Sequence, residues 1–200
     1  MIAVIDYGAG NLKSVTNALD FLKAKYKVTS NPEDIEKAGK IIFPGVGSFG
    51  DCVKALKKRK LFGTLKQQII KKPYLGICLG LQILFESSQE SPGIKGLSIL
   101  KGKNKKFSGK LKVPQIGWNS IKITTKKSKL MKGIKDNSYF YFVHSYYVVP
   151  KDKKITLTKT NYGEEFTSSI ETGNIFGVQF HPERSGEIGL KVLKNFVELP

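Results

Sequence analysis

The first half of the chain alternates short apolar runs with stretches whose apolar residues recur every three or four positions. The stretch 11–25 shows the second pattern, with Leu12, Val15, Leu19 and Leu22 on one helical face. We expect the order strand 2–6, helix 11–25, strand 26–30, helix 31–38, strand 40–45, helical region 49–70 with a possible break at 62–63, strand 73–77 and helix 79–89. This alternation predicts a parallel sheet with helices on both faces.

The second half consists mainly of β-rich segments separated by Gly, Pro and Asn. Four of them, 139–150, 154–160, 164–171 and 174–180, have connections short enough for antiparallel pairing. A last helix is expected at about residues 186–197. The whole pattern predicts one α/β domain over residues 1–200. It should have a mainly parallel central sheet flanked by helices and a smaller antiparallel β region.

The net charge of +18 on 200 residues raises the question of a nucleic-acid partner. Only Arg59 and Arg184 among the 34 basic residues are arginine, whereas direct base readout favours arginine. The lysine runs are scattered and carry no interleaved aromatic residues of the kind that stack bases. We interpret the charge as a solvated lysine-rich surface, with electrostatic steering of an acidic partner or substrate as the weaker alternative. No nucleic-acid partner is expected.

Two cysteines, Cys52 and Cys78, make no disulfide framework. No apolar stretch approaches the roughly 18 residues of a membrane-spanning helix, and the start "MIAVIDYGAGN" is typical of a first strand rather than a signal peptide. We therefore expect a cytoplasmic protein with no membrane partner. In a reducing compartment a free thiol is available for chemistry.

The segment "GICLG" places Cys78 between an apolar strand and a helix-like run, as in a nucleophile elbow. Its sharp turn would lift the side chain above the sheet, and small neighbours are needed because the backbone folds tightly there. The helix N-terminus would favour a thiolate, and the N–H of Leu79 could stabilise an oxyanion. The alternative is a buried structural cysteine. We expect that role for Cys52, which lies in a helical pattern without an elbow.

A cysteine nucleophile usually needs a base, and the chain has two histidines. His181 ends an apolar strand in "GVQFHPE", where parallel-sheet enzymes place their chemistry. Glu183 follows two residues later, and Pro182 stiffens the spacing, so the carboxylate can orient the imidazole. The alternative for this pair is a surface turn. His144 lies in an aromatic strand without a neighbouring carboxylate, so we expect it to be packed or hydrogen-bonded rather than catalytic.

Two glycine-containing loops follow strands in the first half. "FPGVGSFG" (43–50) could direct backbone N–H groups at an anion, but it lacks the lysine and hydroxyl of a phosphate-binding P-loop. An ordinary strand-to-helix turn is the alternative. "DYGAGN" (6–11) lacks the third glycine of a dinucleotide-binding loop. We therefore expect no nucleotide cofactor and no metal.

The motifs "PGVGSF", "GICLGLQ" and "GVQFHPE", in this order, resemble the class I glutamine amidotransferases, the triad glutaminases. "IDYGAGN", "PQIGWN" and "YFVHSYY" narrow the resemblance to the glutaminase subunits of imidazole glycerol phosphate synthase. The likeness covers residues 1 to about 190. It departs at Leu81, Gln115 and Arg184, where this family often has methionine, histidine and lysine.

The resemblance implies a role for each matching position. Cys78 attacks the side-chain amide of the substrate glutamine, His181 serves as base and then as acid, and Glu183 holds His181. The oxyanion lies between the N–H of Leu79 and an N–H of the Val46–Gly47 loop, which flips a peptide before the hole is complete. The positions implied to hold the substrate are Gly47, Gln82, Glu90, Ser145 and Tyr146.

The resemblance also implies a heterodimer with a (β/α)₈ barrel cyclase subunit of the HisF type, which would use the ammonia. The positions implied for the contact face are Asn11, Trp118, Tyr141 and Arg184, and core packing is the alternative for the aromatic ones. Two other functions stay open. One is a glutaminase that feeds an enzyme amidinating surface sugars, and the other is a non-catalytic basic binding module.

Overall fold

The computed structural model describes residues 1–108, 111–125 and 127–200. Its α-helices are α1 (Leu12–Phe21), α2 (Pro32–Lys37), α3 (Phe49–Lys58), α4 (Leu61–Ile69), α5 (Leu79–Gln82) and α6 (Gly186–Val197), with short 3₁₀ turns η1 (Lys153–Ile155) and η2 (Pro182–Arg184). Side-chain caps start several of them: Asn11, Asn31 and Ser48 accept hydrogen bonds from the first turns of α1, α2 and α3.

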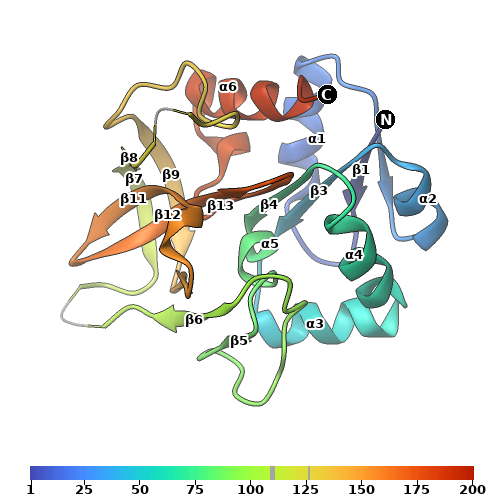
Figure 1. The fold of residues 1–200 in the computed structure, drawn as a ribbon, viewed down its shortest axis with the longest axis horizontal. Coiled ribbons are helices and arrows are strands. Elements are labelled where there is room, and N and C mark those ends of the chain that lie inside the picture. The colour runs from blue at the N-terminus through green and yellow to red at the C-terminus, as the bar shows by residue number, and fades with distance from the viewer. Residues whose placement is uncertain (109–110, 126) are drawn as a thin grey trace.

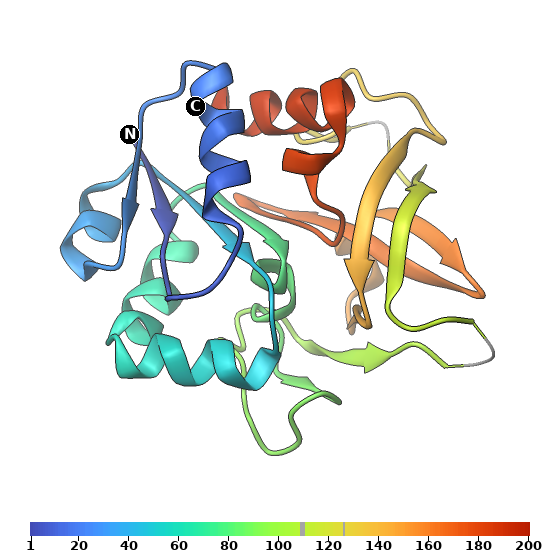
Figure 2. The same cartoon turned by 180° about the vertical axis from the view of Figure 1, so that it is seen from behind.

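The first strands of the chain are β1 (Ile2–Ile5), β2 (Tyr26–Thr29), β3 (Lys40–Gly45), β4 (Tyr74–Cys78), β5 (Ser87–Ser88) and β6 (Gly102–Lys106). The later strands are β7 (Gln115–Ser120), β8 (Lys122–Ile123), β9 (Tyr139–His144), β10 (Tyr146–Pro150), β11 (Thr156–Tyr162), β12 (Glu164–Thr172) and β13 (Ile175–Val178). Figures 1 and 2 show them from opposite sides.

One large sheet runs through the described part of the chain in the order β2-β1-β3-β4-β13-β12-β10-β6-β5. In this order the five strands β2, β1, β3, β4 and β13 are parallel to one another. Strand β12 pairs antiparallel with β13, β10 and β11. Strands β7 and β9 form a separate antiparallel pair. The predicted fold class, a mainly parallel central sheet with helices and a smaller antiparallel region, is confirmed.

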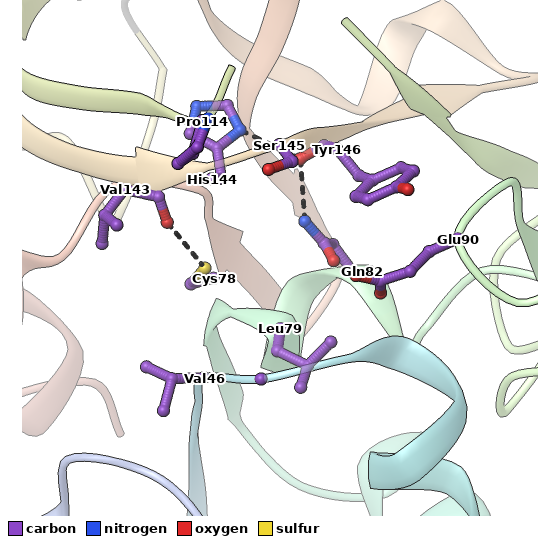
Figure 3. Close-up of a pocket in the computed structure, with 11 residues that line it drawn as sticks. Val46, Cys78, Leu79, Gln82, Glu90, Pro114, Val143, His144, Ser145 and Tyr146 are labelled. Carbon is purple, nitrogen blue, oxygen red and sulfur yellow. Dashed lines mark hydrogen bonds between the residues drawn. The ribbon is translucent and has the colours of Figure 1, made fainter.

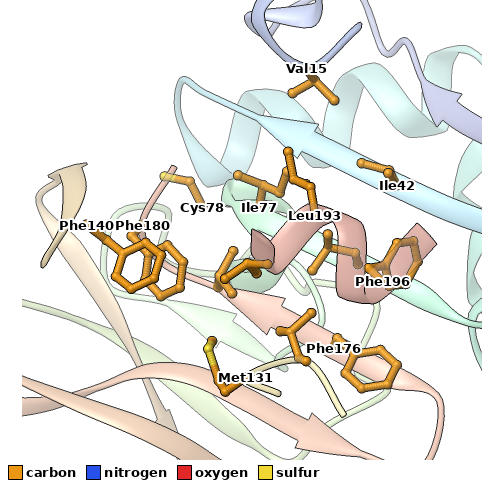
Figure 4. Packing of buried hydrophobic residues seen from close by; sticks show 14 of the residues in the cluster. Val15, Ile42, Ile77, Cys78, Met131, Phe140, Phe176, Phe180, Leu193 and Phe196 are labelled. Carbon is orange, nitrogen blue, oxygen red and sulfur yellow. The ribbon is translucent and has the colours of Figure 1, made fainter. Parts of the chain in front are cut away.

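The sheet separates two apolar cores because neighbouring residues of a strand point to opposite faces. In β3, Ile42 packs on the face covered by α1 and α6, while Ile41 and Phe43 pack on the face covered by α2, α3 and α4. Figure 4 shows the first of these cores, in which Val15, Leu193 and Phe196 meet the strands. Helices therefore cover both faces, as the alternating pattern predicts.

Several boundaries differ from the sequence-based expectations; α1, for example, ends at Phe21 rather than at residue 25. The helical region 49–70 breaks at Arg59–Lys60 rather than at 62–63, with Lys60 in the left-handed conformation (φ 59°). The helix expected over 79–89 ends at Gln82. The strand expected over 139–150 divides at Ser145, so that β9 pairs with β7 and β10 joins the large sheet. Among the described helices, none combines the length and apolar character needed to cross a membrane.

Candidate active site

Cys78 ends β4 and occupies a sharp strand-to-helix turn, with φ 52° and ψ −104°. L-residues rarely adopt this conformation, which costs about 1–3 kcal/mol and is maintained by its surroundings. Two glycines make the turn possible: a Cβ on Gly76 would lie 2.4 Å from the carbonyl oxygen of Gly80, and one on Gly80 would lie 2.1 Å from that of Phe43. The predicted elbow is therefore present. Cys52 is buried in α3 and is a free cysteine.

His181 and Glu183 form a buried pair immediately after β13. The imidazole Nδ1–H donates to Glu183 Oε1 at 2.8 Å, and the two side chains are only 3% and 2% exposed. Pro182 opens the 3₁₀ turn between them and restricts the backbone. The other ring nitrogen, Nε2, is buried without a hydrogen-bond partner among the described residues. The ring is thus oriented from one side and free to exchange a proton on the other.

The parallel pairing of β13 with β4 brings this histidine to the cysteine. Val178 lies opposite Ile77, so His181 follows β13 at the sheet edge where Cys78 ends β4. Burial disfavours the charged imidazolium, but Cys78 and the Glu183 carboxylate together outweigh burial and raise the pKa of His181 well above its ordinary value. The cysteine, the imidazole and the carboxylate therefore form one electrostatic unit.

His144 has a different environment. Burial lowers its pKa to about 4, although the carbonyl of Tyr146 acts in the opposite direction. Both ring nitrogens have partners, with Nδ1 2.9 Å from the Tyr146 carbonyl and Nε2 2.9 Å from Gln115 Oε1. The ring also packs against Phe107 and Phe166. It is the packed, hydrogen-bonded histidine that the sequence indicates.

A pocket of about 230 Å³ opens beside the sulfur (Figure 3). This is smaller than the roughly 300–1,000 Å³ of pockets for drug-sized ligands, so it suits a compact ligand. The residues implied for the oxyanion hole and for glutamine all line it together with Cys78: Val46, Gly47, Leu79, Gln82, Glu90, Ser145 and Tyr146. His181 and Glu183 are not among its lining residues.

The Val46–Gly47 loop has its hydrogen-bonding groups turned toward Tyr7. The hydroxyl of Tyr7 donates to the Val46 carbonyl at 2.8 Å and accepts from the Val46 N–H at 3.2 Å. Tyr7 follows β1, and β3 lies between β1 and β4. The Val46 N–H is therefore engaged by the Tyr7 hydroxyl. The oxyanion role of this loop stays a prediction that requires the peptide to turn, and Gly47, at φ +100°, supplies backbone freedom beside it.

Two other pocket residues are tied to the scaffold. Glu90 Oε2 accepts from the backbone N–H of Phe49 at 2.6 Å, at the start of α3. Gln82 Nε2 donates to the Tyr146 carbonyl at 2.9 Å and to Gln179 Oε1 at 3.3 Å.

Gln179 is not among the functional residues predicted from the sequence. It is fully buried, and its Nε2 donates to Cys78 Sγ at 3.5 Å. Its only signal in the sequence is a polar residue inside the apolar strand that leads to His181. The cysteine sulfur itself faces the Val143 carbonyl at 3.8 Å.

Three of the four residues implied for a partner surface lie together. Trp118 and Tyr141 are opposite each other in β7 and β9, with their rings edge to face at 6.3 Å. The Arg184 guanidinium lies 4.5 Å from the centre of the Tyr141 ring. Trp118 is 56% exposed, although tryptophan is usually covered. Asn11, the fourth, caps α1 and hydrogen-bonds with Ser14.

A search of the described residues finds no group of three or more His, Cys, Asp and Glu side chains arranged to hold a metal ion.

Comparison with known proteins agrees with this geometry. The family model "Glutamine amidotransferase class-I" matches residues 3–199. The imidazole glycerol phosphate synthase subunit HisH of Methanocaldococcus jannaschii is 51% identical, with all of both chains covered. The subunit of the same name from Pyrococcus furiosus is 50% identical over 99% of this chain and 98% of its own. That of Aquifex aeolicus is 48% identical over 96% and 94%.

Solved structures share the fold at low sequence identity. A crystal structure of a glutamine amidotransferase superimposes with a TM-score of 0.77 at 15% identity, over 99% of this chain and 98% of that one. The structure of PurLQS from Thermotoga maritima gives 0.71 at 22% identity, over 98% and 96%. The chain belongs to the class-I glutamine amidotransferases and, within them, to the family of the HisH subunits of imidazole glycerol phosphate synthase.

Proposed function

We propose that this chain is the glutaminase subunit of an imidazole glycerol phosphate synthase, hydrolysing glutamine to glutamate and ammonia. The observation that carries the proposal is Cys78 on a strained elbow beside His181, whose ring is held by Glu183 at 2.8 Å. Membership of the HisH family supports the substrate, because those relatives are named as subunits of that synthase.

The chemistry divides into two displacements at one carbon atom. His181 Nε2 takes the thiol proton, and Cys78 Sγ then attacks the side-chain amide carbon of glutamine as a thiolate. The tetrahedral intermediate would be stabilised by the N–H of Leu79, which starts α5, and by an N–H of the Val46–Gly47 loop after its peptide turns. Breaking the C–N bond, with the proton returned by His181, releases ammonia and leaves a glutamyl thioester on Cys78.

Water then attacks the thioester carbonyl while His181 takes one of its protons. The C–S bond breaks, glutamate leaves, and the sulfur regains its proton. Glu183 stabilises the imidazolium in both halves of the reaction through the hydrogen bond to Nδ1. No cofactor or metal enters any of these steps.

We also propose that the ammonia passes to a separate (β/α)₈ cyclase subunit of the HisF type, because ammonia released into neutral water is protonated and loses its nucleophilicity. The exposed Trp118 lies edge to face with Tyr141, whose ring also faces Arg184, and this group supports a contact face for the cyclase, since aromatic and arginine side chains anchor interfaces. Asn11 is proposed for the same face from its family position. The two free cysteines support a reducing, cytoplasmic setting.

Glutamate release tests the proposal, measured for the wild type, Cys78→Ser and the control Cys52→Ser, each with and without a HisF-type cyclase and its ligand. We expect weak activity of the chain alone and strong stimulation by the partner. Cys78→Ser should lose the activity with its fold intact, and Cys52→Ser should keep it. Full activity of Cys78→Ser would remove the nucleophile from the proposal, and stimulation by an ATP-dependent sugar-modifying synthase instead would reassign the partner.

A further inference from the structure

Gln179 joins the cysteine to the glutamine pocket through a buried chain of hydrogen bonds. Its Nε2 lies 3.5 Å from Cys78 Sγ, a normal donor distance for the large sulfur atom, and its Oε1 accepts from Gln82 Nε2 at 3.3 Å. Gln82 Nε2 also donates to the Tyr146 carbonyl at 2.9 Å. Gln179 and Gln82 are 0% and 4% exposed, so water does not compete for these bonds.

The direction of this chain is set at its far end. A backbone carbonyl can only accept, so the Gln82 atom that faces Tyr146 has to be the nitrogen. Because that same nitrogen faces Gln179, Gln179 must present its oxygen to Gln82. Its N–H₂ group is then left for Cys78. The orientation of the Gln179 amide, normally ambiguous, is thus determined by the network.

We propose that Gln179 is a further functional residue, whose amide N–H stabilises the thiolate of Cys78. The proposal rests on the nucleophilic role proposed for Cys78. The Val143 carbonyl accepts from the thiol and cannot stabilise a thiolate, whereas an N–H donor favours the charged form. Gln179 supplies such a donor, with its Nε2 3.5 Å from this sulfur.

The same chain couples the nucleophile to the substrate pocket. Tyr146 and Gln82 line that pocket, and both lie on the hydrogen-bonded path that orients the Gln179 amide. A movement of the Tyr146 carbonyl would move the Gln82 amide and, through it, the Gln179 amide that donates to Cys78 Sγ.

The titratable groups near Cys78 are His181 after β13, Tyr7 after β1, and the pocket residues His144, Tyr146 and Glu90. None of these groups is changed by a substitution at Gln179. A shift in the pH dependence of Cys78 reactivity in such a variant therefore reports the amide.

The test is the pH dependence of iodoacetamide alkylation at residue 78, followed by peptide mass spectrometry on the full chain. Only the thiolate reacts, and the buried Cys52, whose pKa burial raises, is an internal reference. Gln179→Met keeps the side-chain length and removes the donor. Gln179→Glu keeps an oxygen for Gln82 and places a carboxylate beside the sulfur. Gln68→Met, in a buried glutamine of α4 outside the pocket, is the matched control.

We expect the alkylation midpoint of Gln179→Met to lie about one pH unit higher than that of the wild type, with about tenfold slower alkylation at pH values below both midpoints, as for the loss of one hydrogen bond to a charged group. Gln179→Glu should shift the midpoint at least as far, and Gln68→Met should match the wild type. An unchanged profile in folded Gln179→Met overturns the proposal. If far-UV circular dichroism shows that Gln179→Met is misfolded, an unchanged alkylation profile in Gln179→Glu overturns the proposal instead. Alkylation needs no glutamine, so this outcome is separate from the glutaminase assay.

Discussion

The two hydrogen bonds between Tyr7 and Val46 predict that Tyr7→Phe raises the glutaminase rate of the chain without its partner. The ring is 3% exposed and stacks on Phe43 at 5.2 Å, and phenylalanine preserves this packing. The variant loses only the hydroxyl that binds the Val46 N–H and carbonyl. Since Val46 is 37% exposed, water can satisfy its freed backbone groups.

The size of the effect follows from those two bonds. Each contributes about 0.5–1.5 kcal/mol net, so the resting orientation of the loop loses about 1–3 kcal/mol. This corresponds to a roughly 5–150-fold larger population of the turned loop. The partner-free rate should rise by up to that factor and not beyond the partner-stimulated rate, because a fully turned loop has nothing further to gain.

The assay is glutamate release at saturating glutamine, with and without the cyclase and its ligand. Tyr26→Phe is the matched control, because it removes a phenol hydroxyl bonded to Asp20 on the exposed surface. An unchanged or lower partner-free rate in Tyr7→Phe, together with wild-type stimulation by the partner, would refute the idea that this hydroxyl holds the loop.

Two further predictions concern the elbow and the triad. Gly80→Ala should lower the Tm by about 2–12 °C, because its Cβ would lie 2.1 Å from the Phe43 carbonyl oxygen and overpacking costs about 1–3 kcal/mol. Gly63→Ala is the control and should not lower the Tm, because a Cβ there meets nothing within 4 Å. Equal Tm values for the two variants would contradict the steric account. Against the effect of burial, Cys78 and Glu183 raise the pKa of His181 to about 10, so the stability from its charged form is complete below about pH 6.5 and lost as the pH rises through about 10. Glu183→Gln removes one cause, and its Tm should therefore fall less than that of the wild type between pH 7 and pH 10; an equal or larger fall would count against the pairing.

Local patterns were sufficient for most of the fold. The spacing of Leu12, Val15 and Leu19 predicts α1, and the apolar runs around Ile42 and Ile77 predict two strands, which the structure confirms as β3 and β4. The errors occur where tertiary contacts override the local signal. The aromatic run 139–150 is continuous in sequence, but its two halves pair with different strands, β7 and β6, and the break at Ser145 becomes part of the pocket.

The sequence alone indicated the residues that we propose carry the chemistry, because Cys78 between glycines and His181 two residues before Glu183 are short-range patterns with local physical meaning. It also separated His181 from His144 by the neighbouring carboxylate. Only the tertiary structure decided the rest. The pairing of β4 with β13 joins segments about a hundred residues apart and places the Gln179 amide on the sulfur. The position of Tyr7 across β3 determines where the Val46 N–H points. Such directions depend on which strands become neighbours, and no local pattern specifies that.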